Sequence, residues 1–133
     1  MVVEDFYDFA EELLESTENP HEALLRTVVG RVYYAVYLST REWIDQRFSV
    51  ELSQAQGNSH ERYTNCLKTL QRVHFDLSLS RFARELGELK DKRHFADYHI
   101  EKDDIQDLTN TQEAILQAKK LLNDLKLLKS KYP

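Results

Sequence analysis

The sequence predicts a single all-α domain, an antiparallel bundle of four to five helices that spans residues 1–133. Apolar residues recur along the chain at spacings of three and four, which is the period of an amphipathic helix. Only three glycines and two prolines occur among 133 residues, too few for a turn-rich β protein. A chain of this length can bury a core as one domain without disulfides or metals.

Charge and hydropathy narrow the class of protein. The net charge of −5 argues against a domain that coats nucleic acid nonspecifically, but leaves room for an enzyme that grips a few phosphates. The acidic N-terminus lacks the basic and apolar regions of a signal peptide, and no apolar run approaches the ~18 residues of a membrane span. We therefore expect a soluble, cytoplasmic protein. The single cysteine, Cys66, excludes an internal disulfide and a CxxC-type zinc site.

Apolar stripes and one capping signal predict the first two helices. The first stripe consists of Phe6, Phe9, Ala10, Leu13 and Leu14. Asn19 and Pro20 then resemble an N-cap and first helical residue, and Glu22 completes a capping-box-like start. A long helix should run from there to about Arg47. Apolar and aromatic residues cover most of its circumference, so we expect it to be the central helix.

Turn and capping residues divide the rest of the chain. Residues 54–59 are loop-like, with Gly57-Asn58 as a turn and Ser59 as a cap, and a short helix should cover roughly His60 to Arg72. Ser78 or Ser80 is expected to cap the next helix. After a break near 98–102, Asp103 with Gln106 forms another capping box, which predicts a final helix that continues to the C-terminus.

One arginine interrupts an otherwise apolar helical stripe. The stripe follows spacings of three and four through Leu79, Phe82, Leu86, Leu89, Arg93 and Ala96. An arginine in that register has to pair its guanidinium, reach water or face a cleft. Asp97 lies at i+4, so a structural Arg93–Asp97 ion pair is one interpretation, and an arginine interacting with the helix C-terminus is another.

Two histidines near Arg93 favour a catalytic interpretation. His94 adjoins it, and His99 lies six positions on, where the helix should end. Arginine can hold a phosphate in a bidentate way, and a near-neutral imidazole can move a proton. Together they suit RNA cleavage, in which a base deprotonates the ribose 2′-hydroxyl and a cation stabilises the charge that develops at phosphorus. This chemistry needs no cofactor.

Two segments of the chain resemble the HEPN family (higher eukaryotes and prokaryotes nucleotide-binding). Its nucleases carry an arginine, four to six residues and a histidine, and here five residues separate Arg93 from His99. Residues 30–37, Gly-Arg-Val-Tyr-Tyr-Ala-Val-Tyr, are similar to the "RxxYYA" core of the second helix in small prokaryotic members. The Ala96-Asp97-Tyr98 tripeptide is similar to their "ADY" segment, and the final helix matches in character.

The resemblance implies a helical bundle that acts as a metal-independent endoribonuclease. Arg93 would stabilise the phosphate, and His99 would act as the base or acid. Supporting roles fall to His94, Asp97 and Tyr98, and contacts with RNA to Lys90 and Arg31. Family nucleases juxtapose two Arg/His sets across a two-fold interface, so a homodimer is expected. A toxin or defence effector is implied, with a nucleotidyltransferase antitoxin as a candidate partner.

Two rival functions remain open. A non-catalytic HEPN module would bind a nucleotide or a nucleotidyltransferase, and a structural adaptor would use Arg93 and Asp97 as an ion pair. The other histidines, His21, His60 and His74, are scattered and show no metal-ligand spacing, so we expect no metal site. The basic run of 81–93 is diluted by acids and is typical of a solvated helix face. The arrangement of the side chains distinguishes these functions from the nuclease, because the enzyme needs Arg93 and His99 to open onto one cleft.

Overall fold

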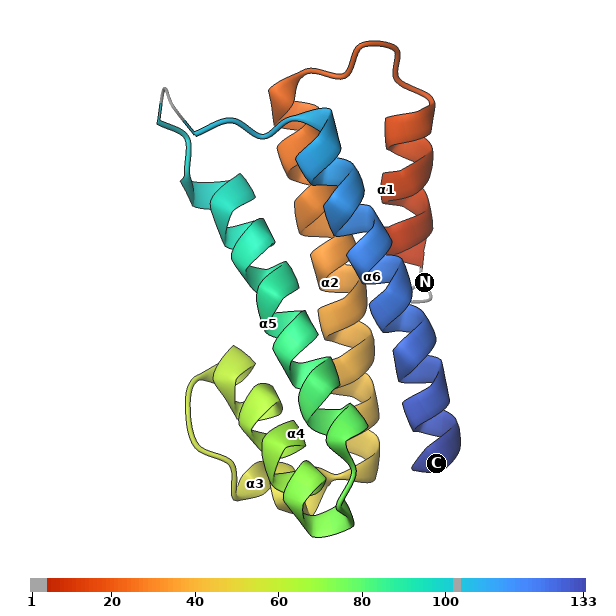
Figure 1. The fold of residues 1–133 in the computed structure, drawn as a ribbon, viewed down its shortest axis with the longest axis vertical. Helices are drawn as coiled ribbons and strands as arrows, with labels where there is room; N and C mark the ends of the chain where they lie inside the picture. The colour runs from red at the N-terminus through yellow and green to blue at the C-terminus, as the bar shows by residue number, and fades with distance from the viewer. Residues whose placement is uncertain (1–4, 102–103) are drawn as a thin grey trace.

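The chain folds into a bundle of α-helices (Figure 1). The computed structural model describes residues 5–101 and 104–133, and these ranges contain six helices and no strand. They are α1 (Asp5–Glu15), α2 (Glu22–Arg47), α3 (Ser49–Ser53), α4 (Ser59–His74), α5 (Leu77–Tyr98) and α6 (Leu108–Lys131). The predicted all-α bundle is confirmed. The extra element is α3, a single turn that is too short to produce an apolar period.

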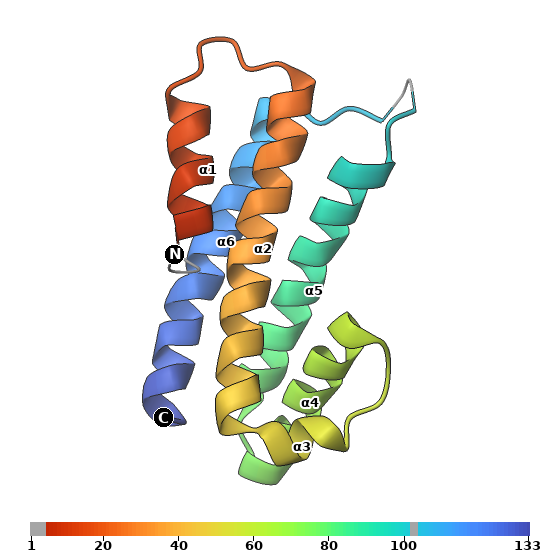
Figure 2. The same ribbon diagram turned by 180° about the vertical axis from the view of Figure 1, so that it is seen from behind.

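Helix α2 is the central element. It packs against α1, α5 and α6, and against α3 at its end. Its neighbours α1 and α5 run antiparallel to it, and α4 lies against α5 at the end where α2 terminates (Figures 1 and 2). Val28, Val32, Ala35 and Val36 are fully buried on α2 because apolar residues surround its axis. This packing confirms the central position that the sequence predicts.

The predicted start of α2 is wrong by two residues. The helix begins at Glu22 with His21 as N-cap, and His21 makes no side-chain capping bond. Asn19 instead adopts a left-handed conformation with φ of 49°, which asparagine tolerates in a tight turn. Glu22 is also used elsewhere, because its Oε1 accepts a hydrogen bond from the backbone N–H of Gln106 at 3.0 Å. The Glu22 side chain therefore binds a distant segment instead of forming the capping box with Asn19 that the local sequence predicts.

Two further caps differ from the predicted serines. Asn58, rather than Ser59, caps α4 and forms a reciprocal capping box with Glu61. Asp76, rather than Ser78 or Ser80, caps α5 by accepting from the Ser78 backbone N–H. In each case a carboxylate or amide side chain one or more residues upstream reaches the free N–H groups first.

The break before the last helix is confirmed, but it is longer than predicted. Helix α5 ends at Tyr98 and α6 begins at Leu108, with Asp107 as a side-chain N-cap. The predicted capping box of Asp103 and Gln106 is wrong at Gln106, whose buried side chain donates to Thr111 Oγ1 at 3.0 Å. Asp103 lies outside the described residues. The side chain of Gln106 satisfies a buried hydroxyl inside the bundle, so it is not free to cap.

A polar cluster locks the C-terminus of α6 to the start of α5. Asp76 accepts hydrogen bonds from the Tyr132 hydroxyl at 2.7 Å and the Ser78 hydroxyl at 2.6 Å, and its Oδ2 lies 2.6 Å from Lys131 Nζ. Trp43 Nε1 donates to the Tyr132 carbonyl at 3.1 Å. Burial opposes ionisation of Asp76, but Lys131 and the hydrogen bonds outweigh it and hold its pKa well below the ordinary value.

Replacing Asp76 with asparagine should lower the free energy of unfolding by about 2 kcal/mol at neutral pH, the scale of hydrogen bonds to a charged group. The depressed pKa makes this contribution complete above about pH 4, and it is lost as the pH falls further. Urea denaturation between neutral pH and about pH 2 should show the two proteins converging on acidification. Asp124→Asn is the control, because its partner Lys120 is exposed and surface pairs contribute about 0–1 kcal/mol. A gap that does not change with pH would contradict this role of Asp76.

Candidate active site at the end of helix α5

Arg93 turns toward α2 rather than into solvent. Its Nη2 donates to the Tyr34 hydroxyl at 2.9 Å, and its Cζ lies 5.1 Å and 5.7 Å from the ring centroids of Tyr34 and Tyr33. Its Nε lies 2.8 Å from Asp97 Oδ2, and the side chains of Arg93 and Asp97 are 16% and 34% exposed. The two sequence segments that carry the family resemblance therefore meet in the fold, one on α2 and one on α5.

The pairing of Arg93 with Asp97 is electrostatic in character. The N–H of Arg93 Nε is buried and makes no hydrogen bond, although the Asp97 carboxylate is close. Asp97 also lies against α2, since its Oδ1 is 3.8 Å from the position that a Cβ on Gly30 would occupy. The ion pair expected of a structural role is thus present.

His99 stands on the exposed side of the same helix end. It is the C-cap residue of α5, its side chain is 49% exposed, and its Nδ1 lies 3.9 Å from Asp104 Oδ2. Its ring stacks on Phe95 with centroids 5.2 Å apart, and the exposed ring of His94 lies 6.0 Å away. Tyr98, which is also exposed, packs against His94 at 4.7 Å. Two imidazoles and a phenol therefore form one solvent-exposed group.

Within one chain, Arg93 and His99 do not face each other. Six residues on a helix correspond to directions about 120° apart, and the described residues show no hydrogen bond or ion pair between the two side chains. Arg93 contacts α2, whereas His99 contacts Phe95 and approaches Asp104. The single shared cleft that the catalytic interpretation requires is not formed by these two side chains of one chain alone.

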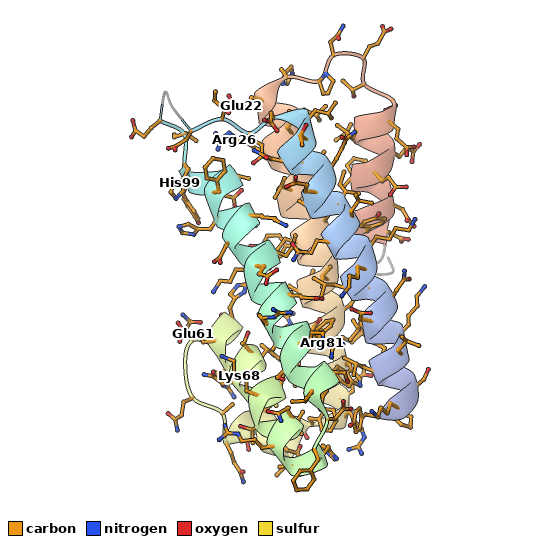
Figure 3. All side chains as sticks on the ribbon, in the orientation of Figure 1. Glu22, Arg26, Glu61, Lys68, Arg81 and His99 are labelled. Carbon is orange, nitrogen blue, oxygen red and sulfur yellow. The ribbon has the colours of Figure 1, made fainter. Side chains whose placement is uncertain are left out.

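Arg26 holds this helix end in place, and sequence reasoning missed it. Its Nη1 donates to the carbonyls of Phe95 and Ala96, at 3.1 Å and 2.8 Å, and its Nη2 to the carbonyl of Asp104 at 3.0 Å. The side chain is 13% exposed and is paired with Glu22 at 2.9 Å. Figure 3 shows Glu22, Arg26 and His99 at the same end of the bundle. Arg26 thereby satisfies carbonyls that the end of a helix leaves free.

The two residues predicted to contact RNA are placed differently. Arg31 is exposed on α2. Lys90 is partly buried and lines a small pocket of about 20 Å³, room for about one water molecule. Among the other lining residues are Tyr33, Tyr37 and His60. Lys90 therefore lies beside the tyrosine cluster of α2, on the side of α5 that faces α4.

His60 belongs to this cluster, although its position in the sequence predicts an isolated histidine. Its Nδ1 forms a 2.7 Å hydrogen bond with the Tyr33 hydroxyl, and its ring stacks on Tyr37 with centroids 4.2 Å apart. Burial lowers the pKa of His60, and the charges of Lys90, Arg93 and Arg41 lower it further. Several cations thus converge on a histidine that favours its neutral form. The sequence gives no signal of this placement, because the tyrosine partners of His60 lie on another helix.

Exposed apolar side chains lie along the connection from α5 to α6. They are Tyr98, Ile100 and Ile105. Apolar side chains that remain exposed together are typical of surfaces that contact another molecule. In residues 5–101 and 104–133, no three His, Cys, Asp or Glu side chains come together in a way that could hold a metal ion. None of the described helices is both long and apolar enough to cross a membrane.

The chain is similar to an uncharacterized protein of Methanocaldococcus jannaschii, with 32% identity over 110 residues. The match covers 73% of this chain and 63% of that protein, so the chain spans less than two thirds of the relative's length. No protein-family model matches the chain, and no solved structure matches it. Because the relative is itself uncharacterized, the function has to be argued from the residues and their geometry.

Proposed function

We propose that this protein is an endoribonuclease of the HEPN type, which cleaves RNA by attack of a ribose 2′-hydroxyl on the adjacent phosphate. One observation carries the proposal. A guanidinium fixed by Asp97 and Tyr34 occupies the same helix end as two exposed imidazoles, those of His94 and His99. Phosphate binding and proton transfer, the two functions that the reaction needs, are therefore offered within two turns of α5.

The reaction uses only groups of the protein and the RNA. A neutral His99 takes the proton of the 2′-hydroxyl, and the oxygen forms a bond to phosphorus as the bond to the 5′-oxygen breaks. An imidazolium, that of His94 or of a second His99, returns a proton to the leaving oxygen. Arg93 stabilises the extra negative charge on the phosphate oxygens. The products are a 2′,3′-cyclic phosphate and a free 5′-hydroxyl.

The proposed enzyme is a two-fold homodimer, which resolves the divergent directions of Arg93 and His99. A two-fold contact near the α5–α6 connection would let His99 of one chain face Arg93 of its partner. The exposed apolar residues Tyr98, Ile100 and Ile105 would be buried in that contact. Asp97 orients Arg93, Tyr98 packs on His94, and Lys90 and Arg31 provide further positive charge for RNA.

A non-catalytic binding module is the second candidate. The Arg93–Asp97 ion pair favours it, because a carboxylate at 2.8 Å competes with a phosphate for the guanidinium. In that case the same surface would bind a nucleotide or a nucleotidyltransferase. If the protein is instead a toxin or defence effector, such a nucleotidyltransferase would be its antitoxin.

Incubation of the purified protein with single-stranded RNA in EDTA tests the proposal. We expect cleavage to persist, because the nucleophile is the substrate's own hydroxyl, and the new ends to carry 2′,3′-cyclic phosphate. A DNA oligonucleotide of the same sequence should stay intact, and activity should elute with the dimer in size-exclusion chromatography. RNA that remains intact, or ends that carry a 5′-phosphate, would support the binding module or a different reaction.

A further inference from the structure

An open groove of about 640 Å³ runs between α4 and α5. Three cations line it, Lys68 from α4 and Arg81 and Arg84 from α5. The hydroxyl residues Thr64 and Ser80 line it as well, and its described lining residues include no carboxylate. Figure 3 shows Lys68 and Arg81 on the two neighbouring helices. In a chain with a net charge of −5, this groove is a local concentration of positive charge.

The fold turns two acids of α5 away from the groove. Glu85 accepts a hydrogen bond from Lys120 at 2.7 Å, and Glu88 accepts one from Gln117 at 3.1 Å, so both acids interact with α6. Arg84 is mostly exposed and lies 4.0 Å from Glu85, the limit of an ion pair. Two of the acids that dilute the basic run, Glu85 and Glu88, thus interact with α6. Arg84 lines the groove on the α4 side, and Arg81 lines both this groove and a pocket beside α6.

Small residues keep the groove open. Ala83 and Gly87 of α5 line it, and a Cβ added to Gly87 would meet no atom within 4 Å. A glycine in the interior of a helix is unfavourable by about 0.5–1 kcal/mol relative to alanine, and no close approach of another element requires one here. The absent side chain leaves space in which a ligand can reach the surface of α5.

The groove continues toward the candidate active site. Thr64 and Gly87 line both the groove and the small pocket of about 20 Å³ beside Tyr33 and Tyr37, which His60 and Lys90 also line. Lys68, Arg81 and Arg84 line the groove itself, whereas Lys90 lines the neighbouring pocket on another side of α5. Three cations on two helices suit a chain of phosphates better than a single ion.

We propose that the α4–α5 groove binds the phosphate backbone of a single-stranded RNA. Cations, hydroxyl donors and a surface without acids suit phosphate oxygens, and His60 and Tyr63 add partly exposed rings at one end. The choice of RNA over another polyanion rests on the proposed function, whereas the location of the groove does not. An acidic peptide is the competing occupant.

Fluorescence anisotropy with a labelled 2′-O-methyl oligouridine of about 16 nucleotides tests this proposal. Such an RNA lacks the free 2′-hydroxyl and cannot be cleaved through it, so binding is measured whether or not the protein is a nuclease. Lys68→Ala with Arg81→Ala should weaken binding tenfold or more, on the order expected for two phosphate contacts. The slope of log K against log salt should become shallower by about 1.4, because each contact with a single strand contributes about 0.7.

Two further variants separate groove binding from general charge. Lys119→Ala with Lys126→Ala removes two exposed cations of α6, makes the same change in net charge, and should leave binding nearly unchanged. Gly87→Leu fills the groove without altering charge and should weaken binding while circular dichroism shows the helices intact. The proposal would be overturned if the groove variants and the control variant lost RNA affinity equally. It would also be overturned if the groove variants lost affinity for a polyglutamate probe but kept their affinity for RNA. Intact RNA binding without cleavage would contradict only the proposed nuclease activity.

Discussion

Replacing His99 with alanine is expected to lower the rate of RNA cleavage by about a hundredfold or more, the usual scale for a positioned proton-transfer group. The side chain is half exposed and makes no hydrogen bond in the described structure, so the fold should be retained. His21→Ala is a matched control, because His21 is another exposed histidine and makes no capping bond. Single-turnover kinetics on a defined RNA would measure the rate.

Arg93 requires a different substitution, since alanine would also remove its contacts with Asp97 and Tyr34. Arg93→Lys keeps the charge but loses the planar fork that holds a phosphate. We expect a loss of cleavage of about a hundredfold with a nearly unchanged unfolding midpoint. If His99→Ala and Arg93→Lys both fold normally and cleave like the parent, this helix end is not the catalytic site. The binding module then becomes the better description.

Replacing Arg26 with alanine should lower the free energy of unfolding by about 3 kcal/mol. The change removes a nearly buried cation that donates to three backbone carbonyls, and it leaves those acceptors without their partner. The end of α5 should also fray, which hydrogen exchange of the His99 amide would detect, because that amide donates to the Phe95 carbonyl. Urea denaturation would give the free energy.

Arg31→Ala on the same helix is the control for Arg26. Arg31 is exposed, so its removal should change stability by no more than about 0.5 kcal/mol. Arg26→Lys should recover only part of the loss, since one ammonium cannot reproduce the two-nitrogen contact with both Phe95 and Asp104. Equal stability of the two alanine variants would show that the end of α5 is held by packing alone.

The helix N-caps and the hydrogen-bond partners of side chains were the features that the sequence predicted least well. Asn19, Ser59 and Gln106 all had suitable local patterns for helix starts, yet neighbouring or distant groups took those roles. Arg26 gave no sequence signal, because its partners are main-chain carbonyls about seventy residues away. His60 was equally silent, since its tyrosine partners lie on another helix. Local patterns identify possible donors and acceptors, and tertiary proximity selects among them.

The sequence by itself determined the all-α class, the central position of α2, the break after Tyr98 and the possibility of an Arg93–Asp97 pair. These follow from the helical period of apolar residues, which acts within a few turns. Only the tertiary structure decided that Arg93 turns to α2 while His99 remains exposed. It alone turned Glu85 and Glu88 of α5 toward α6 while Arg84 lines the groove beside α4, because these two neighbouring helices present different partners to different sides of α5.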